Sequence, residues 1–256
     1  MLDLRILHDL RITAPADVRR AAILLRDTVD GLCGLRTAVS HNISVKDPMR
    51  DADGEILAST VFGFREGADR WWLNSQLALS SPLIAACRFE AEPFWCSEGG
   101  IRTRRHNPLL DNLDFSNFAD RAMTRAAIVV PIHLPFGQVA AASFSPRDGG
   151  ADDLSQEFDR CSDILGVYTR QFVVSYVETM RPKPSNVPEP RLSKREVECL
   201  RWAAFGKTNS EIALILHLSR ATICYHITHA SEKMKAVNRN QTVFKAAQLG
   251  YLGTME

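Results

Sequence analysis

The last quarter of the chain, from Leu192 to Leu252, carries two helix starts close together. Thr208 followed three residues later by Glu211 makes a capping box, which predicts a short apolar helix. Ser219 can cap a longer helix that runs to about Lys235. Two helices joined by so tight a turn predict a helix-turn-helix, a motif whose second helix enters the major groove of DNA.

The second of these helices is predicted to be amphipathic. At about 100° per residue, one stripe is apolar and should face the core of the domain: Ile223, Ile227, Ala230 and Met234. The opposite face would present the candidates for reading base edges: Ala221, Tyr225, Thr228, His229 and Glu232, with Cys224 beside them. Because no Lys or Arg lies in the middle of this face, the commonest bidentate contact to guanine is missing. From periodicity alone, an ordinary amphipathic helix of a four-helix bundle is the alternative.

Charge separates this segment from the rest of the chain. From Arg191 onward there are 10 Lys/Arg and 5 Asp/Glu, whereas the preceding residues have 21 and 25. The asymmetry is the one expected when a single domain meets nucleic acid. Arg220, at the first helical position, would meet a phosphate there, because the helix dipole otherwise disfavours a cation. The full set of candidates for salt-dependent phosphate contacts is Arg195, Lys207, Arg220, Lys233 and Arg239.

The C-terminal segment resembles the DNA-binding domain of LuxR-type transcription regulators across essentially its whole length. The positions that match the family most dependably are Glu196, Leu200 and Gly206. The resemblance implies helices over about 194–205, 209–216, 220–235 and 240–249. It also places the family's base-reading positions on Cys224, Tyr225 and Thr228, in agreement with the face derived from periodicity. Arg220 departs from the family, in which an acidic residue is usual at that position.

A proline-rich phrase, RPKPSNVPEPR over residues 181–191, separates this domain from the front of the chain. Four prolines without an apolar run predict a semi-rigid linker. We therefore expect three parts: a sensor domain over residues 1–180, the linker over 181–191, and the helix-turn-helix domain over 192–256. The length of the chain, 256 residues, suits one domain of each kind.

The front domain alternates between helical and extended patterns. Thr13-Ala14-Pro15 opens an amphipathic helix that ends near Leu32, with Gly34 as its stop. The other predicted elements are strands over 35–44 and 56–64, helices over 68–79 and 108–125, a hairpin of 126–134 with 139–145, and a long helix over 152–180. The predicted fold class is α+β. Its first part is an α/β/α sandwich with a mostly antiparallel sheet, and its second is a small all-α four-helix domain.

The front domain resembles the autoinducer-binding domain of quorum-sensing LuxR regulators, which bind acyl-homoserine lactones between a sheet and one helical layer. The best matching pieces are Pro93-Phe94-Trp95 and the hairpin VVPIHLPFGQVAAASFS. The resemblance implies that the pocket residues are Trp72, Ser81, Trp95 and Ser145. A further family tryptophan aligns with Ala68, or with Trp71 if the alignment has a short deletion. Ser81 stands where the family has an aspartate that accepts the ligand's amide proton. We therefore expect an apolar ligand other than an ordinary acyl-homoserine lactone.

The sequence indicates little other chemistry. It has no Gly-rich phosphate loop, GxSxG or HExxH motif, and we expect no catalytic residue, no enzyme activity and no cofactor beyond a small-molecule autoinducer or related signal. His226 and His229 lack a third ligand, so no metal site is expected. The six cysteines form no CxxC pair and read as small apolar residues of a reducing cytoplasm. No apolar run is long enough to cross a membrane.

The expected partners are a double-stranded DNA operator, a small-molecule signal and a second copy of the chain, because one helix-turn-helix contacts few base pairs. The main alternative is a regulator with the same body but no ligand, controlled by its abundance or by a protein partner. An enzyme fused to a DNA-binding tail is the third hypothesis, and no nucleophile with a neighbouring base supports it.

Overall fold

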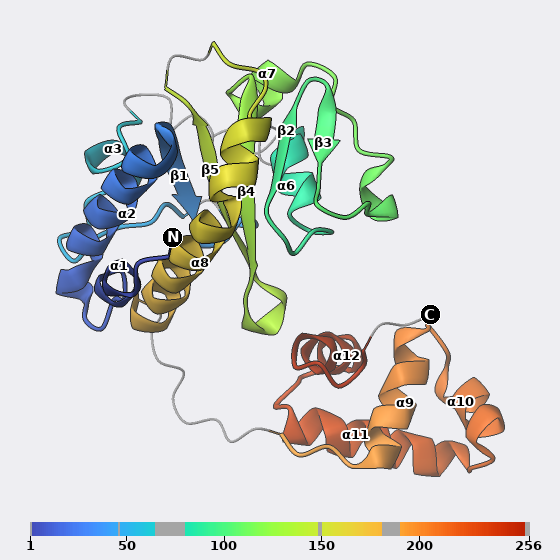
Figure 1. Ribbon diagram of the computed structural model, residues 1–256. Coiled ribbons are helices and arrows are strands. Elements are labelled where there is room, and N and C mark those ends of the chain that lie inside the picture. The colour runs from blue at the N-terminus through green and yellow to red at the C-terminus, as the bar shows by residue number, and fades with distance from the viewer. Residues whose placement is uncertain (1, 46, 65–79, 148–149, 181–189, 254–256) are drawn as a thin grey trace. The chain divides into compact units, whose positions relative to one another are not determined.

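The computed structural model describes residues 2–45, 47–64, 80–147, 150–180 and 190–253 (Figure 1). The chain divides into two compact units. Residues 1–134 and 138–182 form the front unit, and residues 183–256 belong to the C-terminal unit. The predicted linker and the predicted helix over 68–79 fall mostly or wholly outside the described residues.

The front unit is built on a five-stranded antiparallel sheet with the order β1-β5-β4-β2-β3. Its strands are β1 (Leu35–Ser40), β2 (Phe94–Ser97), β3 (Gly100–Arg102), β4 (Ala126–His133) and β5 (Val139–Pro146). The predicted hairpin is confirmed as β4 and β5, with the 3-10 turn η3 (Pro135–Gly137) between them. In the β1–β5 pairing, Arg36 lies opposite Ser145, so these two side chains share one face of the sheet.

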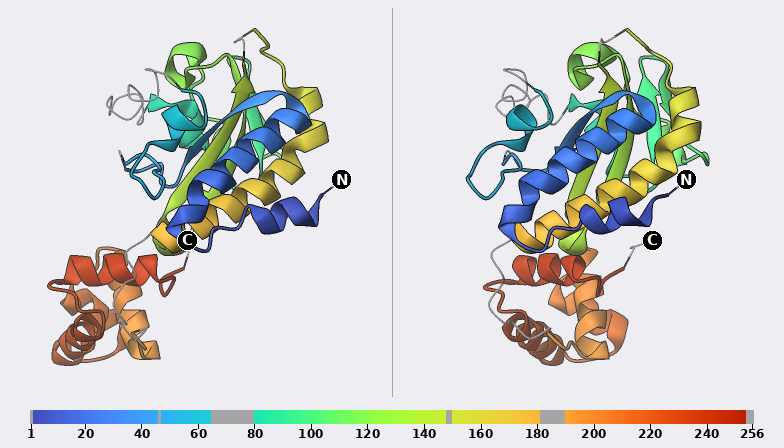
Figure 2. Two further views of the ribbon diagram at one scale, coloured as in Figure 1. Left: turned by 90° about the vertical axis from the view of Figure 1, so that its left-hand side faces the viewer. Right: turned by 60° about the vertical axis from the view of Figure 1, so that its left-hand side comes forward.

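Helices α1 (Leu4–Asp9), α2 (Val18–Cys33) and α8 (Ser155–Met180) lie on one face of this sheet (Figure 2). The start and end of α2 agree with the prediction. The 3-10 turn η1 (Pro15–Asp17) precedes the helix, and Gly34 follows it in the left-handed conformation with φ 68°. The fully buried side chains of Phe144, Tyr168 and Phe172 fill the space between the helices and the sheet.

The opposite face of the sheet is covered by α6 (Pro82–Ala86) and α7 (Phe118–Ala122), with the 3-10 turn η2 (Pro108–Leu110) nearby. Leu83, Ile84 and Phe118 pack there against Phe94 and Val129 of the strands. The front unit is thus an α/β/α sandwich whose sheet is antiparallel, as predicted.

Two sequence predictions for the front unit are wrong. Residues 56–64 are not a strand, since Leu57–Thr60 form the short helix α3. The hydroxyls of Ser59 and Thr60 donate to the Ile56 carbonyl at 3.1 and 2.9 Å, which favours a helical turn over extended backbone. The predicted helix over 108–125 is broken into η2 and α7, because Asn117 and Met123 are left-handed at the ends of α7.

The C-terminal unit has four helices within its described residues: α9 (Lys194–Ala204), α10 (Asn209–Leu216), α11 (Arg220–Lys233) and α12 (Arg239–Gln248). Each begins after a side chain that caps it. Ser193 and Thr208 form full capping boxes, and Ser219 and Asn238 accept from the amides of Thr222 and Gln241. Most of the helix ends predicted from sequence lie within one residue of these bounds, and α11 ends two residues early. The predicted apolar stripe of α11 is buried, with at most 6 % exposure at any of its four residues.

One buried carboxylate joins α9 to α11. Glu196 is 3 % exposed and accepts hydrogen bonds from Lys233 Nζ at 2.9 Å and from the Ser193 amide at 2.7 Å. The ring of His229 lies 3.0 Å from the same carboxylate. Burial alone would raise the pKa of Glu196, but the hydrogen bonds from Lys233, Ser193 and His229 outweigh it and lower the pKa to about 2. Glu196 therefore ties the first helix of this unit to the third.

This network predicts an acid-sensitive C-terminal unit. The folded pKa of Glu196 lies below its ordinary value of 4.5. The stabilisation is therefore complete above pH 4.5 and is lost as the pH falls toward 2, a loss of about 3 kcal/mol. Glu196→Gln should remove most of this pH dependence and destabilise the unit at neutral pH. Urea unfolding of the full chain, followed by pulsed hydrogen exchange in α9 and α11, measures both effects.

Glu232→Gln is the matched control, because Glu232 is an exposed carboxylate on the same helix as His229 and Lys233. It should leave the stability of α9 and α11 within about 0.5 kcal/mol of the wild type. Parallel pH profiles for the wild type and Glu196→Gln between pH 5 and 2 would contradict the assignment.

Candidate functional site

The face of α11 opposite its buried stripe is exposed, as its periodicity predicts. Tyr225 is 60 % exposed, and Ala221 and Thr228 are exposed on the same side of the helix. A phenol, a hydroxyl and two methyl groups on one helix face can donate to base edges, accept from them and pack on thymine methyls. This face is the candidate DNA-reading surface.

Two residues predicted to lie on this surface have partners inside the unit. His229 bonds to Glu196 and also stacks on the ring of Tyr225, with ring centroids 5.4 Å apart and planes 18° apart. Cys224 is half-buried, and its Sγ accepts from Asn209 Nδ2 at 3.1 Å. The prediction that both face outward is therefore only partly right: His229 supports Tyr225, and Cys224 joins α11 to the start of α10.

The five basic candidates for phosphate contacts also differ in their surroundings. Arg195 pairs with Glu198 at 2.8 Å, Lys207 with Glu211 at 4.0 Å, and Lys233 with Glu196. Arg239 donates to the backbone carbonyl of Lys207, so it fastens the turn between α9 and α10.

Arg220 is the exception. It is exposed at the first position of α11, and within the described residues its guanidinium has neither an ion pair nor a hydrogen bond. A cation at a helix N-terminus is unfavourable without an anion nearby. Arg220 is therefore the candidate whose surroundings fit a phosphate contact best.

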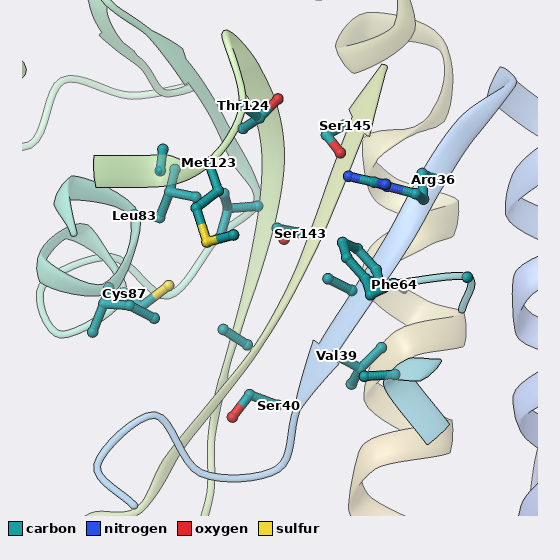
Figure 3. Close-up of a pocket in the computed structure, with 17 residues that line it drawn as sticks. Arg36, Val39, Ser40, Phe64, Leu83, Cys87, Met123, Thr124, Ser143 and Ser145 are labelled. Carbon is teal, nitrogen blue, oxygen red and sulfur yellow. The ribbon is translucent and has the colours of Figure 1, made fainter. Parts of the chain in front are cut away.

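A cavity of about 380 Å³ lies in the front unit on the side of the sheet that faces α6 (Figure 3). Strands β1, β4 and β5 form one wall. The rest comes from α6, from α3 with the segment that follows it, and from the end of α7 with the segment that follows it. Its described lining consists of 17 residues: Arg36, Ala38, Val39, Ser40, Ala58, Gly63, Phe64, Leu83, Ile84, Cys87, Ala122, Met123, Thr124, Val129, Ala141, Ser143 and Ser145. An apolar chamber with a few polar groups is the usual form of a small-molecule site.

Arg36 is the one charged residue among these described lining residues. Its Nε is buried and has no hydrogen-bond partner, while the ring of Phe64 lies 4.2 Å from the guanidinium carbon. Burial, and to a lesser degree the charge of Arg147, lowers the pKa of Arg36. The polar end of the cavity therefore carries a positive charge.

The structure supports some of the predicted pocket residues and not others. Ser145 lines the cavity. Trp95 does not, because side chains alternate along β2: Phe94 and Cys96 face the cavity side, and Trp95 packs into the core beneath α8. Ser81 is fully buried at the N-cap of α6, and it is not among the described lining residues. Trp71 and Trp72 lie outside the described residues.

Four polar lining residues were not predicted from sequence: Arg36, Ser40, Thr124 and Ser143. Arg36 and Ser143 lie on strands that were predicted, but their common face depends on which strands pair. The β1–β5 register places Arg36 opposite Ser145, with Ser143 two residues away on the same strand. The sequence of β5 could have indicated Ser143, because apolar and hydroxyl side chains alternate there. Ala142 and Phe144 face the core, and Ser143 and Ser145 face the cavity.

Across the described parts of the chain, no helix combines the length and hydropathy needed to cross a membrane. In the same residues, no three His, Cys, Asp or Glu side chains gather into a group that could hold a metal ion.

Similarity to known proteins extends these observations. Residues 190–246 match the family described as bacterial regulatory proteins, luxR family. The transcriptional activator protein AhyR of Aeromonas hydrophila is 27% identical over 192 residues, which cover 74% of this chain and 72% of AhyR. A match of this length includes much of the front unit. RpaR of Rhodopseudomonas palustris, a quorum sensing-dependent regulator, is 36% identical over 141 residues, 52% of this chain and 54% of RpaR.

The transcriptional activator VanR of Vibrio anguillarum is 33% identical over 133 residues, so the chain spans about half the length of VanR and RpaR. A crystal structure of Escherichia coli SdiA aligns over 98% of this chain and 97% of SdiA, with 20% identity and a TM-score of 0.49. The named relatives are regulators, not enzymes. Residues 190–246, which make up most of the C-terminal unit, match this family, so the C-terminal unit is a LuxR-type helix-turn-helix domain.

Proposed function

We propose that the chain is a homodimeric transcription regulator that reads an operator with α11 and responds to a small molecule held in the front unit. The observation that carries this proposal is the outer face of α11. Tyr225 and Thr228 are exposed there on a helix that is capped at its start and anchored to α9 through Glu196. We propose that the protein binds its operator in the cytoplasm.

The anchoring supports DNA reading because base contacts require a helix held in a fixed orientation. Glu196 binds two residues of α11, and Asn209 binds a third, Cys224. Tyr225 in turn stacks on His229, which restricts its ring to few rotamers. A hydrogen-bonding side chain that is already ordered loses less conformational entropy when it binds.

The cavity supports control by a small molecule. Its volume of about 380 Å³ lies within the range of small-molecule sites, and apolar side chains make up most of its wall. RpaR is a quorum sensing-dependent transcriptional regulator, and by analogy we propose a diffusible signal for this chain. The cavity's charge argues against a simple copy of the lactone-binding pocket, since the charged group in its described wall is a cation.

Dimerisation follows from the size of the reading surface. A single helix-turn-helix contacts too few base pairs for selection within a genome, so two copies would bind half-sites about one helical turn apart. Such an operator would have the two-fold symmetry of the protein.

Substitutions on α11 test the DNA-reading proposal. Tyr225→Ala and Thr228→Ala should each weaken operator binding by about 1–3 kcal/mol and leave binding to random duplexes nearly unchanged. Arg220→Ala should weaken binding to both duplexes and reduce the salt dependence by about one phosphate contact. Fluorescence anisotropy over a series of salt concentrations separates the two effects.

Lys194→Ala is the matched control, because Lys194 is also an exposed cation at the first position of a helix. It lies at the start of α9, two residues before Glu196 and away from the start of α11, and its loss should change neither affinity nor salt dependence. If Arg220→Ala changed base preference but spared random DNA, its assignment to a phosphate would be wrong.

The oligomeric state tests the dimer proposal. Sedimentation of the full-length protein with operator DNA should give a complex of two chains on one duplex, because two half-sites are needed for specificity. The same measurement without DNA shows whether the dimer forms beforehand. A single bound chain on a duplex that carries both half-sites would contradict the proposal.

A further inference from the structure

We infer that the cavity of the front unit takes an amphipathic carboxylic acid, with its carboxylate on Arg36 and its apolar part along α6 and β4. This inference rests on the proposed function, since it names the class of ligand for the same cavity. It is carried by a cation that has no counter-ion among the described residues, in a chamber whose other described lining is apolar or hydroxylated.

Most of the polar groups of the cavity lie toward one end, and Ser40 lies at the other. Arg36 extends from β1, and Ser145 lies directly opposite it in the strand pairing. Figure 3 shows the guanidinium pointing from β1 toward Ser145, with Ser143 further along β5. Two hydroxyls beside one guanidinium can donate to the same anion, because serine hydroxyls rotate to suit an acceptor.

Arg36 has no paired anion in the part of the chain that the structure describes. No ion pair or hydrogen bond of its guanidinium exists among the described residues, and its Nε is buried. Nearby Arg147 is already paired with Asp30 at 2.7 Å and adds positive charge. Buried N–H groups normally have a hydrogen-bond acceptor. A buried N–H group that faces a cavity and has no acceptor therefore indicates that a ligand supplies one.

Phe64 sets the direction from which that acceptor can come. Its ring lies over the guanidinium at 4.2 Å and covers one face of it. The edge of the guanidinium, which carries the N–H groups, is left for a planar acceptor. A carboxylate fits this edge with two parallel hydrogen bonds, a geometry that an ester or an amide cannot copy with the same strength.

The remainder of the cavity suits an apolar group. Leu83 and Ile84 of α6 and Val129 of β4 line it, together with Met123. Cys87 is also neutral there, since burial raises the pKa of its thiol to about 12. The described lining contains no acidic side chain that would repel an anion.

Paired ligands test the inference. Hexanoate, octanoate, decanoate and 3-phenylpropanoate are each compared with their primary amides by isothermal titration calorimetry on the full-length protein. At least one acid should bind about tenfold or more tightly than its amide, because charge-assisted hydrogen bonds are roughly twice as strong as neutral ones. Arg36→Met, which keeps an unbranched apolar side chain but removes the guanidinium, should abolish the preference.

Arg147→Met is the matched control, because it removes the neighbouring positive charge without touching the lining of the cavity. It should retain the preference for the acid. Equal binding of acids and amides to the wild type, or a preference that survives Arg36→Met, would overturn the inference. Either of these two results would overturn the ligand class but would still be compatible with a front unit that senses a small molecule.

A second variant separates failure of the inference from failure of the proposed function. Ala141→Phe fills the cavity from β5, and it should abolish binding of every probe and change operator binding in the presence of the best acid. If no acid or amide binds the wild type, the inference is overturned. The Ala141→Phe variant is also compared with the wild type on a reporter gene in the native host. If the two proteins regulate the reporter equally, the proposal that a ligand in this cavity controls transcription is wrong as well.

Discussion

The antiparallel pairing of β5 with β1 and β4 is the constraint on which the front unit depends. Side chains alternate along β5, so Ala142 and Phe144 enter the core beneath α2 and α8 while Ser143 and Ser145 face the cavity. A shift of one residue would place serine hydroxyls in the core and a phenylalanine in the cavity. The register that stabilises the core therefore also determines the polar end of the cavity.

The C-terminal unit depends in the same way on one contact that serves both stability and function. Glu196 caps the start of α9, accepts from Lys233 and holds His229, on which Tyr225 stacks. The same residues that order the interior thus orient the exposed face of α11. Its low pKa shows that the folded unit strongly favours the charged carboxylate.

Local chemistry explains which parts could be predicted from sequence. The helices of the C-terminal unit begin at Ser193, Thr208 and Ser219, whose capping is visible over three residues of sequence. The cavity depends instead on strand pairing between residues far apart, so Arg36 was missed and Trp95 was assigned to the wrong face. The strand predicted over residues 56–64 was wrong for a local reason. Its β-branched and aromatic residues favour strands, whereas the hydrogen bonds that the Ser59 and Thr60 hydroxyls donate to the Ile56 carbonyl favour a helical turn.

The proposed regulator has an anchored reading helix in one unit and a cavity with a cation in the other, and its defining activity is the reading of a specific operator by α11. Selection of binding sites from a pool of random duplexes by the full-length protein tests this activity most directly. The enriched sites should contain two half-sites related by two-fold symmetry, with centres about 10 base pairs apart or a multiple of that spacing. A pool that stays random after repeated selection at physiological salt would contradict it.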